Sequence, residues 1–208
     1  MNKICVVGLG PGNLDFLTGA GKKAIESCEV VIGGERQLEE LDELISKKCE
    51  KYTLGKLLEV VDYIKSKEGK DITVVVSGDT GFYSLLPFLK KNFKSEEIRV
   101  IPGISSYQYL FSRIGECWQN YTLASVHGRD FDYIKSLQND TGVVLLTDDK
   151  NTPYDIAKKI CEAKITDVEM VIGERLSYSD EKISKVKVTD YNLLKRDFKM
   201  NIVILRKI

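Results

Sequence analysis

Residues 3–13, KICVVGLGPGN, constrain the fold of this chain more than any other stretch. An apolar run at residues 4–7 passes directly into a turn that carries Gly8, Gly10 and Gly12. Glycine tolerates positive φ and lets another group approach the bare main chain. A strand that ends in such a turn is typical of α/β folds, which bind ligands at the carboxyl ends of parallel strands.

The same turn matches the dinucleotide-binding fingerprint only in part. That fingerprint needs a third glycine where this chain has Asn13, and Pro11 lacks the N–H that a helix facing pyrophosphate would offer. Thr18 is the better N-cap, so we expect the next helix to start late, away from the glycines. Glu35 follows the second strand where a ribose-binding acid would lie, which keeps a dinucleotide site open as the weaker alternative. A turn in which the glycines serve only the backbone geometry would also fit this sequence.

Composition narrows the class of protein. Of the 208 residues, 43% are hydrophobic and 30% are charged, which predicts a globular protein. Lys plus Arg and Asp plus Glu both number 31, so the sequence lacks the basic surplus of a nonspecific nucleic-acid binder. The 5 cysteines include no CxxC pair, and no His/Cys/Asp/Glu cluster has metal-ligand spacing. We therefore expect free thiols, no protein-held metal, no signal peptide or membrane segment, and a cytoplasmic protein.

Short apolar runs alternate with amphipathic stretches through the first half of the chain. The continuous β-branched run at residues 72–76 indicates a strand buried on both faces of a parallel sheet. Strands are expected at residues 4–7, 29–32, 49–52, 72–76 and 98–101, and helices at 18–27, 35–46, 55–66, 81–92 and 105–114.

The regular spacing of apolar residues stops at residues 115–120, and a second pattern of strands and helices follows. Strands are expected at 121–126, 143–147 and 168–173, with helices at 131–137 and 152–163. Residues 182–189 alternate apolar residues with lysine, and residues 200–205 form a last strand, so antiparallel pairing is expected at the end. The sequence predicts two α/β domains, residues 1–114 and a mixed-sheet domain of residues 115–208, with a ligand cleft between them.

Polar residues follow several of the predicted strands. Asp79 could accept a hydrogen bond from a ligand or cap the next helix, and Ser105 and Ser106 could do the same with their hydroxyls. His127 is the only histidine, and it is either a general base or a structural side chain. The loop GERLSY follows residues 168–172, where a turn with a surface ion pair around Arg175 is the simpler interpretation.

In their order along the chain, these loops resemble the tetrapyrrole methylase family. The segments GLGPGN, SGDTGF, PGISS, LLTDDKNTP and GERLSY carry the resemblance over essentially the whole chain. Within the family, the short length, SVHGRD and GERLSY are similar to the precorrin C5-methyltransferase branch of cobalamin synthesis. One departure is Thr80, where many members have proline. The resemblance implies an S-adenosylmethionine-dependent methyltransferase of two α/β domains, the cofactor lying between them, and a homodimer.

The resemblance also implies the cofactor contacts and the place of the macrocycle, whereas side-chain chemistry suggests the cations for its carboxylates. The candidate cofactor contacts are Leu9, Gly78, Asp79, Phe82, Ser105, Ser106, Leu146, Thr147, Gly173 and Leu176. The macrocycle would lie over Gly10, Pro11 and Gly12, and its carboxylates would meet Arg36, His127 and Arg129, because arginine suits bidentate carboxylate binding. His127 is the single candidate base, and a mechanism without a base stays open.

Three kinds of alternative remain at this stage. Other members of the same fold methylate a different ring carbon, an rRNA ribose or a modified histidine of a translation factor. A nicotinamide-dependent oxidoreductase would rest on Gly8, Gly10 and Glu35, and a non-catalytic binding module would need no proton-transfer group. The expected partners are a small tetrapyrrole and a separate enzyme that methylates C15 and decarboxylates, with no nucleic acid and no membrane.

Overall fold

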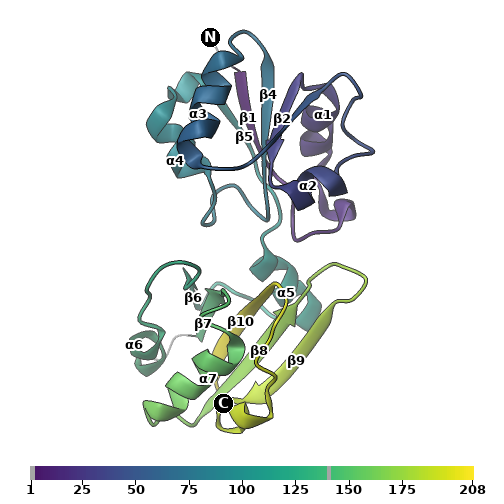
Figure 1. The fold of residues 1–208 in the computed structure, drawn as a ribbon. Helices are drawn as coiled ribbons and strands as arrows, with labels where there is room; N and C mark the ends of the chain where they lie inside the picture. The colour runs from purple at the N-terminus through teal and green to yellow at the C-terminus, as the bar shows by residue number, and fades with distance from the viewer. Residues whose placement is uncertain (1–2, 140–141) are drawn as a thin grey trace. The chain divides into compact units, whose positions relative to one another are not determined.

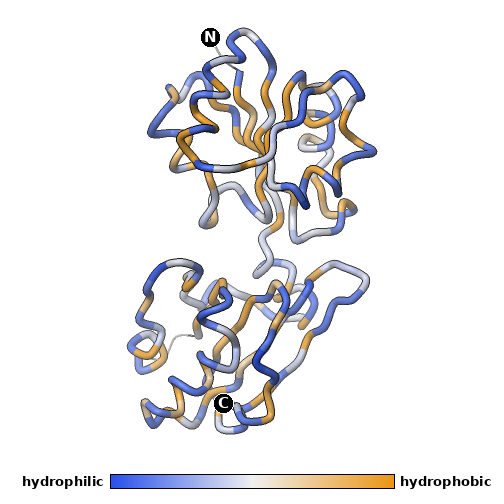
Figure 2. The backbone as a smooth tube through the Cα atoms, viewed as in Figure 1, coloured by the Kyte–Doolittle hydropathy of each residue, from blue (hydrophilic) through white to orange (hydrophobic). Residues whose placement is uncertain are grey.

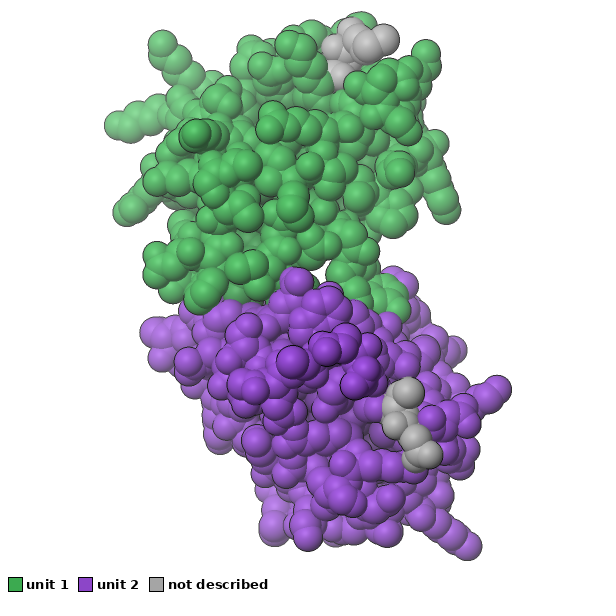
Figure 3. Space-filling model, turned by 180° about the vertical axis from the view of Figure 1, so that it is seen from behind, with its two compact units in different colours: residues 1–105 green, residues 106–208 purple. Residues whose placement is uncertain are grey.

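The computed structural model describes residues 3–139 and 142–208. The chain divides into two compact units, residues 1–105 and 106–208 (Figure 3). The division falls before helix α5 (Ser106–Ile114), whereas the sequence analysis places the boundary after this segment. Helix α5 therefore belongs with the second unit.

The first unit is built on a five-stranded sheet in the order β3-β2-β4-β1-β5 (Figure 1). Every neighbouring pair is parallel, as the β-branched run predicts. The strands are β1 (Lys3–Gly8), β2 (Val30–Gly33), β3 (Glu50–Thr53), β4 (Asp71–Val76) and β5 (Ile98–Ile101). All five carboxyl ends consequently lie at one edge of the sheet.

Helices cover both faces of this sheet. On one face α3 (Leu57–Ser66) and α4 (Leu86–Asn92) pack against Val6 and Val74, and on the other α1 (Gly19–Ser27) and α2 (Glu35–Glu40) pack against Val7 and Val75. Neighbouring strand residues thus enter opposite cores, because successive side chains of a strand alternate between faces. Figure 2 shows hydrophobic residues concentrated along these strands. Two short 3₁₀ helices complete the unit, η1 (Leu14–Phe16) and η2 (Ser95–Glu97).

Two helices are shorter than the periodicity predicts. Helix α2 ends at Glu40, after which Asp42 N bonds to Glu39 O and Leu44 N to Leu41 O in tighter turns. Helix α4 starts at Leu86, because Tyr83 has a φ of 50°, which no helix interior contains. The late start of α1 is confirmed, with the Thr18 hydroxyl accepting from Gly21 N at 3.1 Å.

The second unit has a mixed sheet in the order β6-β7-β10-β8-β9. Strands β6 and β7 are parallel and the other neighbours antiparallel, as predicted for the end of the chain. The half-exposed lysine-rich strand is β9, at the edge. The strands are β6 (Tyr121–Ser125), β7 (Gly142–Leu146), β8 (Val168–Glu174), β9 (Lys182–Lys187) and β10 (Asn201–Lys207).

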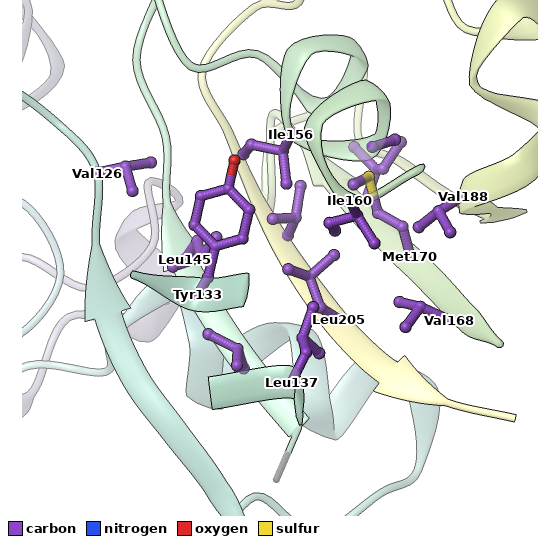
Figure 4. Packing of buried hydrophobic residues seen from close by; sticks show 14 of the residues in the cluster. Val126, Tyr133, Leu137, Leu145, Ile156, Ile160, Val168, Met170, Val188 and Leu205 are labelled. Atoms are coloured by element: carbon purple, nitrogen blue, oxygen red, sulfur yellow. The ribbon is translucent and has the colours of Figure 1, made fainter. Parts of the chain in front are cut away.

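A single large core fills one face of this sheet (Figure 4). It is covered by α6 (Tyr133–Gln138), α7 (Pro153–Glu162) and the 3₁₀ segment η3 (Val188–Leu193). Helix α5 buries Leu110 and Phe111 outside this core, and Phe111 meets Tyr121 of β6 edge to face. Among the described residues, no helix is long and apolar enough to cross a membrane.

Candidate functional site

In the first unit, the glycine turn after β1 pairs with the turn after β4. Gly10 N donates to Gly78 O at 3.1 Å, and Gly78 N donates to Gly10 O at 2.8 Å. Leu9 N also donates to Val76 O at 2.9 Å, and the Leu9 side chain is buried. Gly10 and Gly78 have φ of 86° and 66°, a region that favours glycine. The candidate residues Leu9, Gly10 and Gly78 are therefore held together at the sheet edge.

The turn after β5 packs against the same two turns, main chain on main chain. A Cβ on Gly103 would lie 2.2 Å from Gly78 O, and a Cβ on Gly8 would lie 2.6 Å from Gly103 N. Glycine is required at these positions for packing between turns, whatever ligand binds. Gly10 and Gly12 have no side chain and Pro11 is buried, so this turn presents little side-chain bulk.

Asp79 joins two of these turns through its carboxylate. Oδ1 accepts from Gly103 N at 3.2 Å, and Oδ2 accepts from Gly81 N at 2.7 Å. It does not cap a helix that starts at Gly81, as the sequence allows, because α4 starts at Leu86. A carboxylate offers about four acceptor positions, so Asp79 keeps capacity for a ligand donor.

The remaining candidates of the first unit lie around the same edge. Ser105 is 2% exposed, and half-buried Phe82 contacts Tyr83 edge to face. Arg36 lies in the first turn of α2 and pairs with Glu40 across 3.3 Å. Ser106 begins α5 and belongs to the second unit.

The second unit also gathers its candidates at one sheet edge. Strands β6, β7 and β8 point the same way, since β10 is antiparallel to both β7 and β8. The loops after these strands therefore meet the start of β10. Thr147 Oγ1 donates to Asn201 O at 2.8 Å, and Arg175 N donates to Met200 O at 2.9 Å. Half-buried Leu146 ends β7 at this place, and buried Thr147 follows it.

The loop that carries His127 is fixed to the loop after β7. His127 Nδ1 lies 2.9 Å from Thr147 O, and Gly128 N donates to Asp148 Oδ2 at 2.8 Å. Both His127 and Arg129 are exposed. This loop thus presents one imidazole and one guanidinium, two residues apart in the chain.

The loop after β8 is tightly wound. Arg175 and Ser177 have φ of 51° and 68°, and Leu176 between them is 5% exposed. The Leu176 side chain lies over Gly173, where an added Cβ would meet Leu176 Cδ2 at 2.9 Å. Arg175 Nε bonds to Asp180 Oδ1 at 3.0 Å, which is the surface ion pair that the sequence suggests.

Several residues that shape these edges were absent from the sequence prediction. Asp148 binds four N–H groups, and the buried Glu174 carboxylate accepts from Lys195 Nζ and Lys199 N, both at 2.8 Å. The spacing Asp-x-x-Asn at Asp148 and Asn151 is a signal for such a turn. Glu174 had no comparable local signal. Within residues 3–139 and 142–208, no group of three or more His, Cys, Asp or Glu could hold a metal ion.

Comparisons with known proteins agree on the family. A family model described as tetrapyrrole (corrin/porphyrin) methylases matches residues 3–191. A cobalt-precorrin-7 C(5)-methyltransferase of Salmonella typhimurium is 32% identical over 203 residues, 97% of this chain and 98% of that protein. A probable cobalt-precorrin-7 C(5)-methyltransferase of Methanocaldococcus jannaschii is 32% identical over 87% of each chain.

Solved structures share the fold. A cobalt precorrin-4 methyltransferase aligns with a TM-score of 0.84 at 19% identity, over 98% of this chain and 94% of that one. A uroporphyrin-III C-methyl transferase from Thermus thermophilus, complexed with S-adenosyl homocysteine, aligns with a TM-score of 0.76 at 17% identity, over 99% and 92%.

Proposed function

Because the chain belongs to the tetrapyrrole methylase family, we propose that it transfers the methyl group of S-adenosylmethionine to C5 of cobalt-precorrin-7 in cobalamin biosynthesis. The observation that carries this proposal is 32% identity to a cobalt-precorrin-7 C(5)-methyltransferase over 97% of the chain. The protein is an S-adenosylmethionine-dependent methyltransferase by family. We infer the methylated carbon and the substrate from this nearly full-length match to a cobalt-precorrin-7 C(5)-methyltransferase.

The strand-end edge of the first unit has groups suited to S-adenosylmethionine. Asp79 has lone pairs left for an ammonium or a hydroxyl, and half-buried Phe82 offers aromatic surface close to buried Leu9. We assign the cofactor to these residues with Gly78 and Ser105. In the second unit, the proposed cofactor contacts are Ser106, Leu146, Thr147, Gly173 and Leu176. When bound, the cofactor supplies an electrophilic methyl group on sulfur.

The substrate is a flat macrocycle with many carboxylates, and the chain has a net charge of +0. Local cations must therefore bind the substrate, and Arg129 beside His127 is the first choice, with Arg36 second. The small turn at Gly10, Pro11 and Gly12 suits a flat ring, because it has little side-chain bulk.

The protein's main contribution to the reaction is placement. Holding two reactants in near-attack geometry can lower the barrier by about 7–11 kcal/mol at best. Main-chain hydrogen bonds join the turns proposed to bind the cofactor, which suits this task. His127 is the candidate base for the proton that the substrate loses.

We further propose that the enzyme is a cytoplasmic homodimer that acts beside a separate C15-methylating, decarboxylating enzyme.

Ligand-dependent unfolding followed by turnover tests the function. A ligand of the folded state raises the unfolding temperature, so S-adenosylmethionine and S-adenosylhomocysteine should raise it and NAD should not. Mass spectrometry should then show that cobalt-precorrin-7 gains one methyl group. A shift with NAD alone would contradict the cofactor. Cofactor binding without methylation of any corrinoid would contradict the activity and leave the cofactor assignment intact.

A further inference from the structure

The imidazole of His127 has a defined tautomer in this fold. Its Nδ1 lies 2.9 Å from the carbonyl oxygen of Thr147. A carbonyl oxygen only accepts hydrogen bonds, so Nδ1 must carry the proton. In the neutral ring the lone pair is then on Nε2. Within the part of the chain that the structure describes, Nε2 has no hydrogen-bond partner, and the His127 residue is exposed.

Asp148 fixes the loop that carries this imidazole. Its Oδ2 accepts from Gly128 N at 2.8 Å, directly after His127. Its Oδ1 accepts from Lys150 N at 3.0 Å, from Asn151 N at 2.7 Å and from Asn151 Nδ2 at 3.0 Å. Burial opposes ionisation of Asp148, but these donors outweigh it and lower the pKa of the carboxyl to about 2. The carboxylate therefore stays charged and keeps these bonds at every pH at which the protein would work.

The acceptor of the imidazole is fixed as well. Thr147 is 8% exposed, and its hydroxyl bonds to Asn201 O at 2.8 Å and to Asn201 Oδ1 at 2.7 Å. Asn151 Nδ2 also donates to Val126 O at 3.2 Å, which binds the residue before His127 to the same turn. Main-chain and side-chain hydrogen bonds thus fix the positions of the imidazole and of the carbonyl group that it contacts.

We propose that Asp148 is a positioning residue that holds His127 in the Nδ1-protonated tautomer and thereby presents Nε2 as the general base of the methyl transfer. The role in proton transfer rests on the function proposed above, whereas the tautomer does not. In the step, an electron pair of the substrate carbon forms the bond to the methyl carbon. The methyl–sulfur bond breaks with its electrons staying on sulfur. The proton that the macrocycle loses goes to Nε2, which gives an imidazolium.

Nitrogen NMR tests the tautomer without any turnover. His127 is the only histidine, so a tag-free protein labelled with ¹⁵N-histidine gives one pair of ring signals. At a pH at which the ring signals show a neutral imidazole, the wild type should have Nδ1 protonated and Nε2 unprotonated. Asp148→Asn should shift the equilibrium toward the Nε2-protonated form. The matched control Asp149→Asn changes the exposed neighbour and should leave the spectrum unchanged.

Kinetics tests the base. His127→Ala should lower kcat by about 100-fold or more, in the range of general base catalysis. Asp148→Asn should lower kcat by up to about 100-fold, since misplacing a reacting group by about 1 Å can cost that much. Calorimetric affinity for S-adenosylmethionine should stay at the wild-type value in Asp148→Asn.

The positioning role, the base and the proposed function are contradicted by different results. A wild-type spectrum with Nε2 protonated, or identical spectra for Asp148→Asn and wild type, would overturn the positioning role. Unchanged kcat in His127→Ala would overturn the base. The expected spectra together with no methylation of any corrinoid would contradict the proposed function but not the tautomer.

Discussion

The carboxylate of Asp79 bonds to the main chain of Gly103, with Oδ1 accepting from Gly103 N at 3.2 Å. Its second oxygen accepts from Gly81 N at 2.7 Å within its own turn. The residue therefore joins the turns after β4 and β5, and the proposed cofactor edge depends on it for shape as well as for charge.

Asp79→Ala should weaken both folding and cofactor binding. A lost hydrogen bond that leaves a partly buried N–H without a partner costs about 1–3 kcal/mol. We expect a lower free energy of unfolding in urea and a higher Kd for S-adenosylmethionine by calorimetry. Asp79→Asn keeps one acceptor oxygen and should fall between Asp79→Ala and wild type. Wild-type values of both quantities in Asp79→Ala would show that this carboxylate is dispensable.

Gly103→Ala should destabilise the protein by forcing the turns apart. The added Cβ would lie 2.2 Å from Gly78 O and 2.7 Å from the Gly8 carbonyl, and these are backbone atoms that must move together. Overpacking of this kind typically costs about 1–3 kcal/mol. Gly19→Ala is the matched control, because nothing lies within 4 Å of its added Cβ and alanine favours the start of α1. Urea unfolding should show opposite signs for the two variants, and equal effects would contradict the packing argument.

Tyr133→Phe should stabilise the second unit. Among the residues that the structure describes, the Tyr133 hydroxyl is the one buried side-chain polar atom without a hydrogen-bond partner (Figure 4). Burial raises the pKa of this phenol to about 12, with smaller contributions from Asp155 and Asp132. Removing an unsatisfied buried hydroxyl should raise the free energy of unfolding by about 1 kcal/mol.

The matched control for Tyr133 is Tyr154→Phe. The Tyr154 hydroxyl accepts from Arg196 Nη2 at 2.9 Å, and the residue is 8% exposed. Its loss should lower the free energy of unfolding by about 0.5–1.5 kcal/mol. If Tyr133→Phe is the more destabilising of the two in urea, the hydroxyl has a function that the fold does not explain.

The sequence predicts the sheets well, because their signals are local. The run at residues 72–76 becomes the central strand β4 of a parallel sheet, and the alternating lysines become the edge strand β9. The sequence predicts helix lengths less well, because tertiary packing decides them. Leu41 and Ile45 are buried in the core beyond the end of α2, although the backbone there is no longer a regular helix.

The candidate site shows the same division between local and long-range signals. Glycines and polar residues predict the loops at strand ends, and each sheet gathers its own loops at one of its edges. The bonds that fix those loops join residues far apart in the sequence, such as His127 with Thr147 and Thr147 with Asn201. No pattern within one segment predicts such a pair. The requirement for Gly103 has the same origin, because two other turns impose it.

Arg129→Ala should weaken binding of the corrinoid and leave cofactor binding at the wild-type level. Arg129 follows His127 on an exposed loop, and guanidinium binds carboxylates in a bidentate way. Loss of one charge-assisted contact should raise the substrate KM by about tenfold, equivalent to roughly 1.5 kcal/mol. Arg99→Ala is the control, since Arg99 is an exposed arginine inside β5 rather than in a strand-end loop. Equal KM values for the two variants would remove Arg129 from the substrate site.

Cys28 and Cys49 should resist alkylation in the folded protein. Their sulfur atoms lie 3.6 Å apart, and Cys28 Sγ also donates to Ile25 O at 3.2 Å. Burial, reinforced by the neighbouring Cys49, raises the pKa of Cys28 to about 12, and burial also raises the pKa of Cys49. Because the thiolate is the nucleophile, little of it is present at any pH well below that value. Cys117 is exposed and should react first with iodoacetamide.

Peptide mass spectrometry over a time course separates these cysteines. The native protein should label Cys117 rapidly and Cys28 slowly, whereas protein unfolded in urea should label both at similar rates. Cys117→Ser should remove the fast phase and leave the slow one unchanged. Rapid labelling of Cys28 in the native protein would mean that α1 and β2 separate readily around it. The thiol pair would then report opening of the first unit rather than its closed core.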